Sequence, residues 1–254
     1  MRTKRIDSIE QFIEQEKSVS LDTLCEEFEV SKNTIRRDIN ELVKKGTIKK
    51  VYGGVTVNQT AESQPLLPYQ QRHDSFAEEK DAICRLAVEH VNDGDNIYID
   101  TGTTCMNMID HMADINCTII TNSLHVCWKA VPYPNLKVIS LPGILKRETL
   151  SFVGSDVTNH LQTFNITKAF MACAGLTVNN GVTNASTEEY LIKKAVIENS
   201  RQHYLLTDHS KFDRASLMTY CGLEEIHHII TDMAPGKKYL NFCKEHGITI
   251  ETCR

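Results

Sequence analysis

The chain has 254 residues, of which 41% are hydrophobic and 24% charged, and its formal net charge is −5. This length exceeds one average domain and leaves enough chain for a sizeable core. The sequence excludes a membrane span, because no run of about 18 apolar residues is present, and no apolar segment follows the charged residues 1–5 as it would in a signal peptide.

The first sixty residues predict three short helices. Apolar residues recur at helical spacing through residues 6–13, residues 20–29 and residues 30–46. Ser20 and Ser31 stand where an N-cap hydroxyl would accept a hydrogen bond from a free backbone N–H. Because only a few residues separate the second helix from the third, we expect a helix-turn-helix.

The third helix is predicted to bury one face and to expose a cationic face that also carries amides. Its apolar residues fall at i, i+4, i+7 and i+8, from Ile35 to Val43. Arg and Asn on the opposite face have paired donors and acceptors that fit guanine and adenine edges in the major groove. This pattern indicates a DNA recognition helix. The residues of the outward face are Asn33, Arg36, Arg37, Asn40 and Lys44.

A basic hairpin is predicted after the third helix. Gly46 can end that helix, and β-prone runs flank Gly53-Gly54 within residues 47–57. Three helices and a hairpin make a winged helix-turn-helix over residues 1–57. Residues 30–57 hold seven Lys/Arg and two acids, a net +5, so the remaining residues carry −10.

This charge distribution concentrates phosphate contacts at one site of an otherwise acidic chain. Two alternatives to DNA binding are open. The arginines could belong to an ordinary solvated helix face, or the head could mediate contacts with proteins only. The second helix and the hairpin, which stand at the expected spacing on either side, favour DNA binding.

Residues 58–74 are predicted to be a linker, because they lack periodicity and contain Pro65 and Pro68. In residues 75–254 predicted strands alternate with helices. We therefore expect an α/β domain with a mainly parallel sheet covered on both faces. The expected strands are residues 96–100, 118–121, 136–141, 169–174, 203–207, 226–231 and 248–251, and the expected helices are residues 83–91, 103–112, 124–131, 187–199 and 238–246.

Polar residues follow several of these strands, and ligands of such sheets bind beyond the carboxyl ends of the strands. The loop at residues 100–104 has three hydroxyls and a glycine before a helix, a composition that can present donors to a phosphate. One such loop is usually turn chemistry, but five on one edge favour a ligand site. The candidate contacts are Asp100, Thr101, Gly102, Thr103, Thr104, Thr121, Asn122, Ser123, Lys146, Gly175, Asn184, Glu188, Asp208 and Lys211.

The cysteines and histidines give no metal or cofactor prediction. The nine cysteines are scattered without a Cys-x-x-Cys pair, which argues against a zinc site and against a disulfide framework. They are typical of thiols in a reducing cytoplasm. His227 and His228 are adjacent on a predicted strand and would point to opposite faces, so we expect them not to share a metal.

The N-terminal sixty residues resemble the DNA-binding head of the DeoR family of bacterial sugar-catabolism regulators. The matching positions are Val30-Ser31, residues 34–39, Leu42, Gly46 and Gly53-Gly54. The resemblance implies that Ser31, Asn33, Thr34, Arg36 and Arg37 face an operator, and we expect Asp38 to orient a neighbouring arginine. The expected DNA contacts are Ser31, Lys32, Asn33, Thr34, Arg36, Arg37, Asn40, Lys49, Lys50 and Tyr52.

The remainder resembles the sensor domain of the same family, which is similar in fold to ribose-5-phosphate isomerase and binds phosphorylated sugars. By this resemblance residues 100–104 match the phosphate loop, Lys146 and residues 208–211 match ligand loops, and Glu188 lies near the isomerases' general base. The chain has residues 174–177, Ala-Gly-Leu-Thr, where the isomerases have Asp-Gly-Ala-Asp. It also has Pro142-Gly143 where the family commonly has two glycines.

The resemblance implies a repressor that is released from operator DNA by a phosphorylated sugar and acts as a homodimer or homotetramer on repeated half-sites. The alternative is a sugar-phosphate isomerase with an appended winged helix. The missing aspartates remove part of the acid/base set that isomerisation requires, which favours the regulator.

Overall fold

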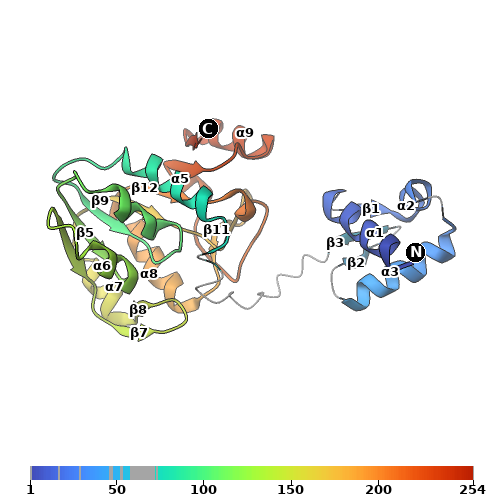
Figure 1. The fold of residues 1–254 in the computed structure, drawn as a ribbon, viewed down its shortest axis with the longest axis horizontal. Coiled ribbons are helices and arrows are strands. Elements are labelled where there is room, and N and C mark those ends of the chain that lie inside the picture. Colours follow the sequence, from blue (N-terminus) through green and yellow to red (C-terminus); the bar gives the residue numbers. More distant parts are fainter. Residues whose placement is uncertain are drawn as a thin grey trace. The chain divides into compact units, whose positions relative to one another are not determined.

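The computed structural model describes residues 2–16, 18–28, 30–45, 48–51, 54–57, 72 and 74–253. The chain forms two compact units, Met1–Glu62 and Ser63–Arg254, which are described separately (Figure 1). No helix within these described ranges is both long enough and apolar enough to cross a membrane. Most of the expected linker, residues 58–74, lies outside the described residues; Arg72 and Asp74 are described and belong to the second unit.

The first unit is a three-helix domain with a small antiparallel sheet of strand order β1-β3-β2. The helices and the hairpin lie where the sequence predicts them. Strand β1 was not predicted, since it is only three residues long. Ser20 ends β1 and also caps α2, where its hydroxyl accepts a hydrogen bond of 3.0 Å from Thr23 N. The elements are α1 (Arg2–Glu16), β1 (Ser18–Ser20), α2 (Leu21–Glu27), α3 (Lys32–Lys45), β2 (Ile48–Val51) and β3 (Gly54–Val57).

The core of the first unit joins all three helices to the sheet. Ile9, Leu24, Ile35 and Val55 are each fully buried in it. Gly54 allows the sheet to close against β1, because a Cβ at this position would lie 2.4 Å from the carbonyl oxygen of Val19. Of the predicted Gly53-Gly54 pair, Gly54 is therefore needed so that β3 can pack against β1.

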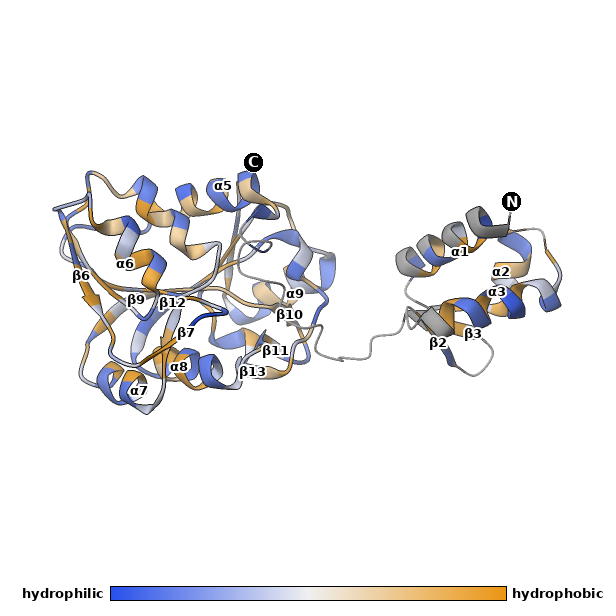
Figure 2. Cartoon of the chain, turned by 60° about the horizontal axis from the view of Figure 1, so that its bottom comes forward, coloured by the Kyte–Doolittle hydropathy of each residue, from blue (hydrophilic) through white to orange (hydrophobic). Residues whose placement is uncertain are grey.

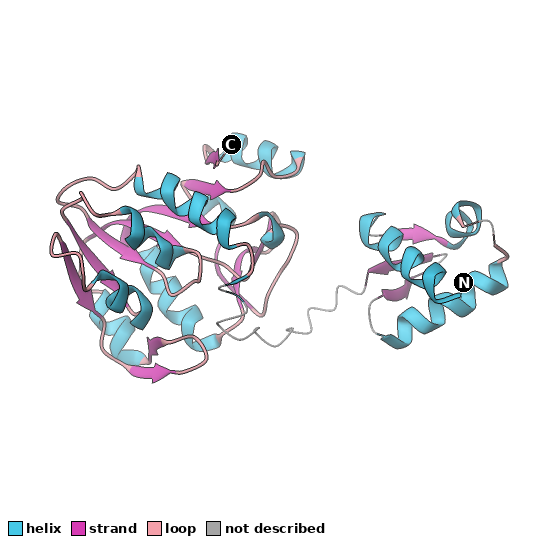
Figure 3. Ribbon diagram, in the orientation of Figure 1, coloured by secondary structure: helices cyan, strands magenta, loops and turns pink. Residues whose placement is uncertain are grey.

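In the described part of the second unit, seven parallel strands form one sheet of order β15-β14-β12-β9-β4-β5-β6 (Figure 3). The predicted mainly parallel sheet is confirmed. Its strands are β4 (Asn96–Ile99), β5 (Cys117–Thr121), β6 (Leu136–Ser140), β9 (Ile166–Met171), β12 (Ser200–Leu206), β14 (His228–Thr231) and β15 (Thr249–Thr252).

Helices cover both faces of this sheet, and alternate strand residues enter two separate cores. Tyr98 packs with residues of the helices α7, α8 and α9, whereas Ile97 and Ile99 pack with residues of α5, η1 and α6. Figure 2 shows α6 and α8 with both hydrophobic and hydrophilic residues, as expected of helices that lie on a sheet. The helices are α5 (Ala77–Val88), the 3₁₀ helix η1 (Cys105–His111), α6 (Leu124–Ala130), α7 (Ser155–Leu161), α8 (Thr187–Glu198) and α9 (Lys237–His246).

The sequence missed helix α7 and the small elements that surround the sheet, and the helix expected at residues 103–112 is the 3₁₀ helix η1. A two-stranded hairpin and a second small sheet of order β10-β11-β13 have strands of only three or four residues, too short to show a period. These elements are β7 (Ile144–Lys146), β8 (Ser151–Val153), β10 (Gly175–Thr177), β11 (Gly181–Asn184), β13 (Met218–Cys221), η2 (His209–Lys211) and η3 (Leu223–Glu225).

Candidate functional site

Helix α3 presents the polar face that the sequence predicted. Ile35, Ile39 and Leu42 are buried, with at most 1% of each side chain exposed. Arg36 and Arg37 are exposed on the helix, so both guanidinium groups can reach a partner outside the unit. Among the other expected DNA contacts, Ser31, Lys32, Asn33 and Asn40 are exposed and Thr34 is half-buried.

Two interactions fix the position of α3. The Ser31 hydroxyl accepts a hydrogen bond of 3.3 Å from Thr34 N, so Ser31 caps the helix as expected. Asp38 is buried and accepts a hydrogen bond of 2.8 Å from Arg5 Nε of α1. The arginine that Asp38 orients is thus a neighbour in space, 33 residues away in the sequence. This pair joins α1 to α3.

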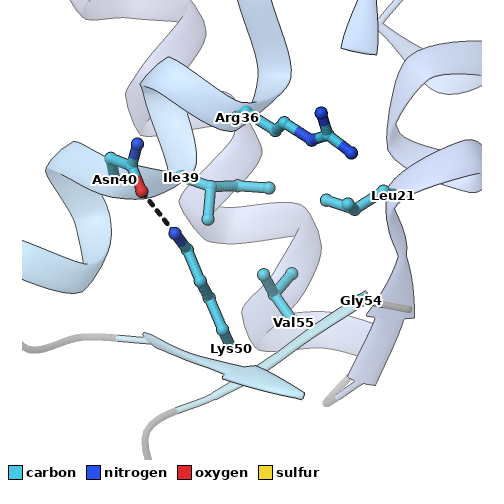
Figure 4. Close-up of a pocket in the computed structure, with 7 residues that line it drawn as sticks. All are labelled: Leu21, Arg36, Ile39, Asn40, Lys50, Gly54 and Val55. Carbon is cyan, nitrogen blue, oxygen red and sulfur yellow. Dashed lines mark hydrogen bonds between the residues drawn. The ribbon is translucent and has the colours of Figure 1, made fainter. Parts of the chain in front are cut away.

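A pocket lies between α3 and the hairpin strands (Figure 4). Asn40 Oδ1 accepts a hydrogen bond of 2.5 Å from Lys50 Nζ across it, and Arg36 and Leu21 form its opposite side. The bond holds β2 beside the outward face of α3, which places the exposed Lys50 next to Asn40. Lys49 lies in β2, and Tyr52 lies outside the described residues.

In the second unit, the candidate ligand site lies where the strand order of the main sheet reverses. Strands β4, β5 and β6 follow one another toward one edge, and β9, β12, β14 and β15 toward the other. The reversal therefore falls between β4 and β9, and ligands of open α/β sheets bind beyond the carboxyl ends of strands at such a point. Asp100 and Ala172 follow these two strands, and Asp100 Oδ2 accepts a hydrogen bond of 2.8 Å from Ala172 N. Gly102 is required there because a Cβ would lie 2.3 Å from that of Ala172.

A buried ion pair lies under this loop. Lys193 of α8 donates hydrogen bonds to the Asp100 carboxylate and, at 3.0 Å, to the Ala172 carbonyl oxygen. The two charged side chains are 4% and 2% exposed. Burial opposes the charge of Lys193, but Asp100 and Glu189 raise the pKa of its ammonium group above the ordinary lysine value. Lys193 is therefore a fixed cation at the switch point.

Glu189, one turn before Lys193, places a second buried carboxylate beside the pair. Its Oε1 accepts hydrogen bonds of 3.3 Å from Thr101 and Ser151, and its Oε2 accepts one of 3.3 Å from Asn184. We call Asp100, Thr101, Glu189 and Lys193 the switch-point cluster. Its buried donors and acceptors suit hydroxyl groups of a polar ligand.

The side chains of residues 121–123 mostly form hydrogen bonds within the second unit. Thr121 Oγ1 donates a 2.7 Å hydrogen bond to the Ile99 carbonyl oxygen, and Asn122 Oδ1 accepts one of 2.7 Å from the Tyr98 hydroxyl. Ser123 caps α6 by accepting from Val126 N at 3.3 Å. These expected ligand contacts therefore support the loops beside the cluster.

Lys146 and Glu188 meet each other at the surface, outside the switch-point cluster. The Lys146 ammonium group donates to the Glu188 carboxylate and, at 3.0 Å, to the Ser186 hydroxyl. Hydrogen bonding to Lys146 lowers the pKa of Glu188, whose side chain is 54% exposed. The carboxylate of this helix that points into the cluster is the adjacent Glu189.

A second group of residues connects Thr103, Arg72 and Lys80 by hydrogen bonds and includes the charged Asp208 and Lys211 near Lys80. The Arg72 carbonyl oxygen accepts hydrogen bonds from the Lys80 ammonium group and, at 3.4 Å, from Thr103 Oγ1. Burial lowers the pKa of Lys80, with Asp208 opposing this effect and Lys211 adding to it. Asp208 is buried, and its Oδ2 has no hydrogen-bond partner among the residues that the structure describes.

Within the described ranges, Lys211 forms no ion pair with a carboxylate. We call Arg72, Lys80, Thr103, Asp208 and Lys211 the Thr103 cluster. Its cations and the Thr103 hydroxyl suit an anionic group of a ligand.

The two remaining predicted ligand contacts, Gly175 and Thr104, pack against other parts of the second unit. Gly175 packs so closely on Arg214 that a Cβ would lie 2.4 Å from the Arg214 carbonyl oxygen. The Thr104 carbonyl oxygen accepts a hydrogen bond of 2.9 Å from the Cys84 thiol. Both positions therefore shape the loops of the site through backbone packing.

Sequence reasoning missed Glu189, Lys193 and Ser151. Ser186 caps α8 by accepting a hydrogen bond of 3.3 Å from Glu189 N, and the two residues have the spacing of a helix capping box. One signal was available: Glu189 and Lys193 are charged residues at i and i+4 on the face of α8 that also carries the buried Ile192 and Val196. Charges on the apolar face of a helix are rarely buried unless they are paired.

Comparisons with known proteins agree with this arrangement. Residues 5–61 match the family model of the DeoR-like helix-turn-helix domain, and residues 75–233 match that of the DeoR C terminal sensor domain. The HTH-type transcriptional regulator IolR of Bacillus subtilis is 42% identical over 251 residues, which cover 98% of this chain and 99% of the relative.

Two further relatives are named as repressors. The HTH-type transcriptional repressor GlcR of Bacillus subtilis is 30% identical and covers 97% of this chain and 95% of its own length. The glycerol-3-phosphate regulon repressor of Escherichia coli is 28% identical and covers 99% of both chains.

Among solved structures, ribose 5-phosphate isomerase A of Methanocaldococcus jannaschii aligns with 54% of this chain and 55% of its own, at 18% identity and a TM-score of 0.40.

A winged helix-turn-helix with an exposed arginine face, followed by an α/β sensor domain, defines a DNA-binding transcriptional regulator. Both family models match, and together they cover most of the chain. The chain belongs to the DeoR family. Its relatives are regulators, so the chain is a transcriptional regulator and not a sugar-phosphate isomerase.

Proposed function

We propose that this DeoR-family chain represses a sugar-catabolic operon and leaves its operator when a phosphorylated sugar binds the second unit. The observation that carries the proposal is the pairing of an exposed recognition face on α3 with buried polar clusters at the switch point of the sensor sheet. Two relatives named as repressors, one of them of a glycerol-3-phosphate regulon, support it. The operator and the transcription machinery place this activity in the cytoplasm.

On the DNA side, the proposed contacts divide into two kinds. Arg36, Arg37 and Asn40 would read base edges in the major groove, where bidentate arginine and asparagine contacts discriminate between bases. Lys50 and Lys49 of β2 would contact phosphates and add affinity without base discrimination. A homodimer or homotetramer would present the heads to repeated half-sites.

On the effector side, the phosphate would bind at the Thr103 cluster and the sugar hydroxyls at the switch-point cluster. Lys211 and the Thr103 hydroxyl supply donors for the phosphate, and the Glu189 carboxylate can accept hydrogen bonds from hydroxyl groups. The two clusters are continuous, because Asp100, Thr101 and Thr103 belong to the same loop after β4.

Arg72 would change its contacts when the ligand binds. Its carbonyl oxygen accepts the hydrogen bond from Thr103 Oγ1, and Lys80 donates to it and to the Ser75 carbonyl oxygen. A phosphate that engages the Thr103 hydroxyl and the Lys80 ammonium would compete with these bonds. Arg72 would then be released from Thr103 and Lys80.

The sugar is proposed from a narrower resemblance. Residues 30–34, 39–40 and 51–55 resemble those of the repressor of myo-inositol catabolism in Gram-positive bacteria. This resemblance points to an inositol catabolic operon, with a phosphorylated deoxy-keto-gluconate as inducer.

The test is an electrophoretic mobility shift of the full chain on the promoter fragment upstream of the host's inositol catabolic genes. We expect a salt-sensitive complex that the phosphorylated deoxy-keto-gluconate dissociates and that inorganic phosphate and glucose 6-phosphate do not. A coupling free energy of about 1–3 kcal/mol would weaken operator binding roughly 5–150-fold. A complex that no phosphorylated sugar weakens would refute release by an effector.

A further inference from the structure

Three side chains outside the proposed DNA and effector sites meet near the edge of the main sheet. His90 follows α5, His228 begins β14, and Glu251 lies in β15. His90 Nε2 lies 2.9 Å from Glu251 Oε2, and His228 Nδ1 lies 3.2 Å from Glu251 Oε1. One ligand atom from each residue lies within 4.8 Å of the others. His228 is at the amino end of its strand, whereas the effector loops follow carboxyl ends, so this group is separate from them.

An aromatic stack holds the histidine rings in place. The His228 ring stacks on Tyr204 with centroids 4.5 Å apart and planes 11° apart, and Tyr204 stacks in turn on Phe170 at 4.9 Å. His90 lies 5.0 Å from the same Tyr204 ring. The two imidazoles are therefore held close together around Glu251 by packing, which lowers the cost of ordering them around a ligand.

We propose that His90, His228 and Glu251 form a binding site for a divalent transition-metal ion of the zinc class. Zinc bonds to imidazole nitrogen and carboxylate oxygen are about 2.0–2.2 Å long, so tetrahedral neighbours lie roughly 3.4 Å apart. His90 and His228 now contact different oxygens of Glu251, at 2.9 and 3.2 Å, and no two of the three ligand atoms are more than 4.8 Å apart. Coordination would therefore require shifts of at most roughly 1.4 Å between ligand atoms. Two nitrogen ligands favour zinc over magnesium or calcium, which prefer oxygen ligands.

Charge and exposure are compatible with an ion at this position. Within the described ranges, Glu251 pairs with no lysine or arginine, and its two oxygens face the two histidine rings. The three side chains are 22–24% exposed, so water can reach the site and occupy a fourth coordination position. The alternative is a metal-free hydrogen-bonded chain in which each ring donates to one carboxylate oxygen.

Bound metal would join the end of α5 to two neighbouring strands. In the described sheet, β15 is the outermost strand and is paired on one side only, with β14. A coordinated Glu251 would fix β15 to β14 and to His90 beyond α5. The site would therefore stabilise this edge of the sensor sheet.

The test uses the full chain, purified without a histidine tag, stripped with a chelator and titrated with zinc chloride alone. We expect one zinc ion per chain by elemental analysis after dialysis, and a higher melting temperature by mass action. Cobalt substitution distinguishes this site from the nine cysteines, because thiolate ligation gives an intense near-ultraviolet charge-transfer band and nitrogen and oxygen ligation does not.

Three variants assign the site. Glu251→Gln keeps the shape of the side chain, and His90→Ala removes a ring that lies outside the strands. Loss of a residue that only hydrogen-bonds to a metal ligand costs about 10–100-fold in metal affinity. Each of these variants removes a ligand itself, so we expect a larger loss of zinc affinity. His246→Ala removes an exposed histidine of α9 and serves as the matched control with unchanged binding. Zinc binding that is the same in Glu251→Gln and wild type, a thiolate band with cobalt, or no zinc retained by the wild type would each overturn the proposal.

Discussion

Replacing Lys193 with methionine tests whether the switch-point cluster depends on its buried ion pair. The substitution keeps the side-chain length and removes the cation that pairs with Asp100, whose side chain is 2% exposed. Breaking a buried pair by removing one partner costs about 3–5 kcal/mol, because the other charge stays buried without compensation. For a unit of this size that loss corresponds to a fall in melting temperature of about 6–20 °C.

Urea unfolding of the full chain, followed by circular dichroism and by Trp128 fluorescence, measures this effect. Trp128 is the single tryptophan of the chain and lies in the second unit, so its signal identifies the transition of that unit. Asp100→Asn and the double variant complete a thermodynamic cycle. We expect the double variant to cost less than the sum of the two single variants by about 1–3 kcal/mol.

The cycle also defines the result that would refute the reasoning. If the costs of Lys193→Met and Asp100→Asn add to within about 0.5 kcal/mol, the two side chains do not stabilise each other. A loss below about 1 kcal/mol for Lys193→Met alone would place the lysine in a solvated position. Either result would remove the fixed cation from the switch point.

Two further predictions concern the proposed DNA and effector sites, and a third concerns the packing of the first unit. Arg37→Ala should weaken operator binding by about 1–3 kcal/mol and relax base preference. Lys50→Ala should weaken binding to operator and random DNA alike and reduce the dependence of affinity on salt concentration. Equal losses of affinity for Arg37→Ala on both DNAs in a fluorescence-anisotropy titration would contradict base readout. Lys211→Ala should bind the operator as wild type does but need at least about tenfold more effector for release, the loss of one phosphate contact of about 1.4 kcal/mol; release at the wild-type effector concentration would exclude Lys211 from the site. Gly54→Ala should destabilise the first unit by more than about 1 kcal/mol, because its Cβ would lie 2.4 Å from the Val19 carbonyl oxygen; an unchanged melting curve would show that β3 can shift away from β1.

The sequence predicted α3 and its outward face well, because helical periodicity is a property of neighbouring residues. Ser31 was recognised as a cap for the same reason. The partner of Asp38 was not identifiable, since Arg5 lies 33 residues away and approaches only when α1 packs on α3. Strand β1 carried no readable signal, because three residues cannot establish an alternation.

In the second unit, the order of the main-sheet strands and of the helices other than α7 was predictable. The residues that point into the site were only partly predictable. The loop at residues 100–104 lies at the switch point, where the sequence placed a ligand loop. Which of two adjacent glutamates points toward that loop depends on how α8 is rotated against β9 and β12. The structure turns Glu189 inward and leaves Glu188 with Lys146. His90, His228 and Glu251 could not be grouped in advance, because they come from three segments.

The parallel order of the sensor sheet has a consequence for how the protein is made. Asp100 and Lys193 are 93 residues apart, so the switch-point cluster assembles only after α8 has left the ribosome. The first unit spans only residues 1–62, so its internal contacts join residues that are close in the sequence, and local contacts of this kind favour rapid folding. At about 5–20 residues per second, translation of the rest of the chain takes roughly 10–40 s. During that interval the newly synthesised first unit can fold and search DNA, whereas the site that binds the sugar phosphate has not yet formed.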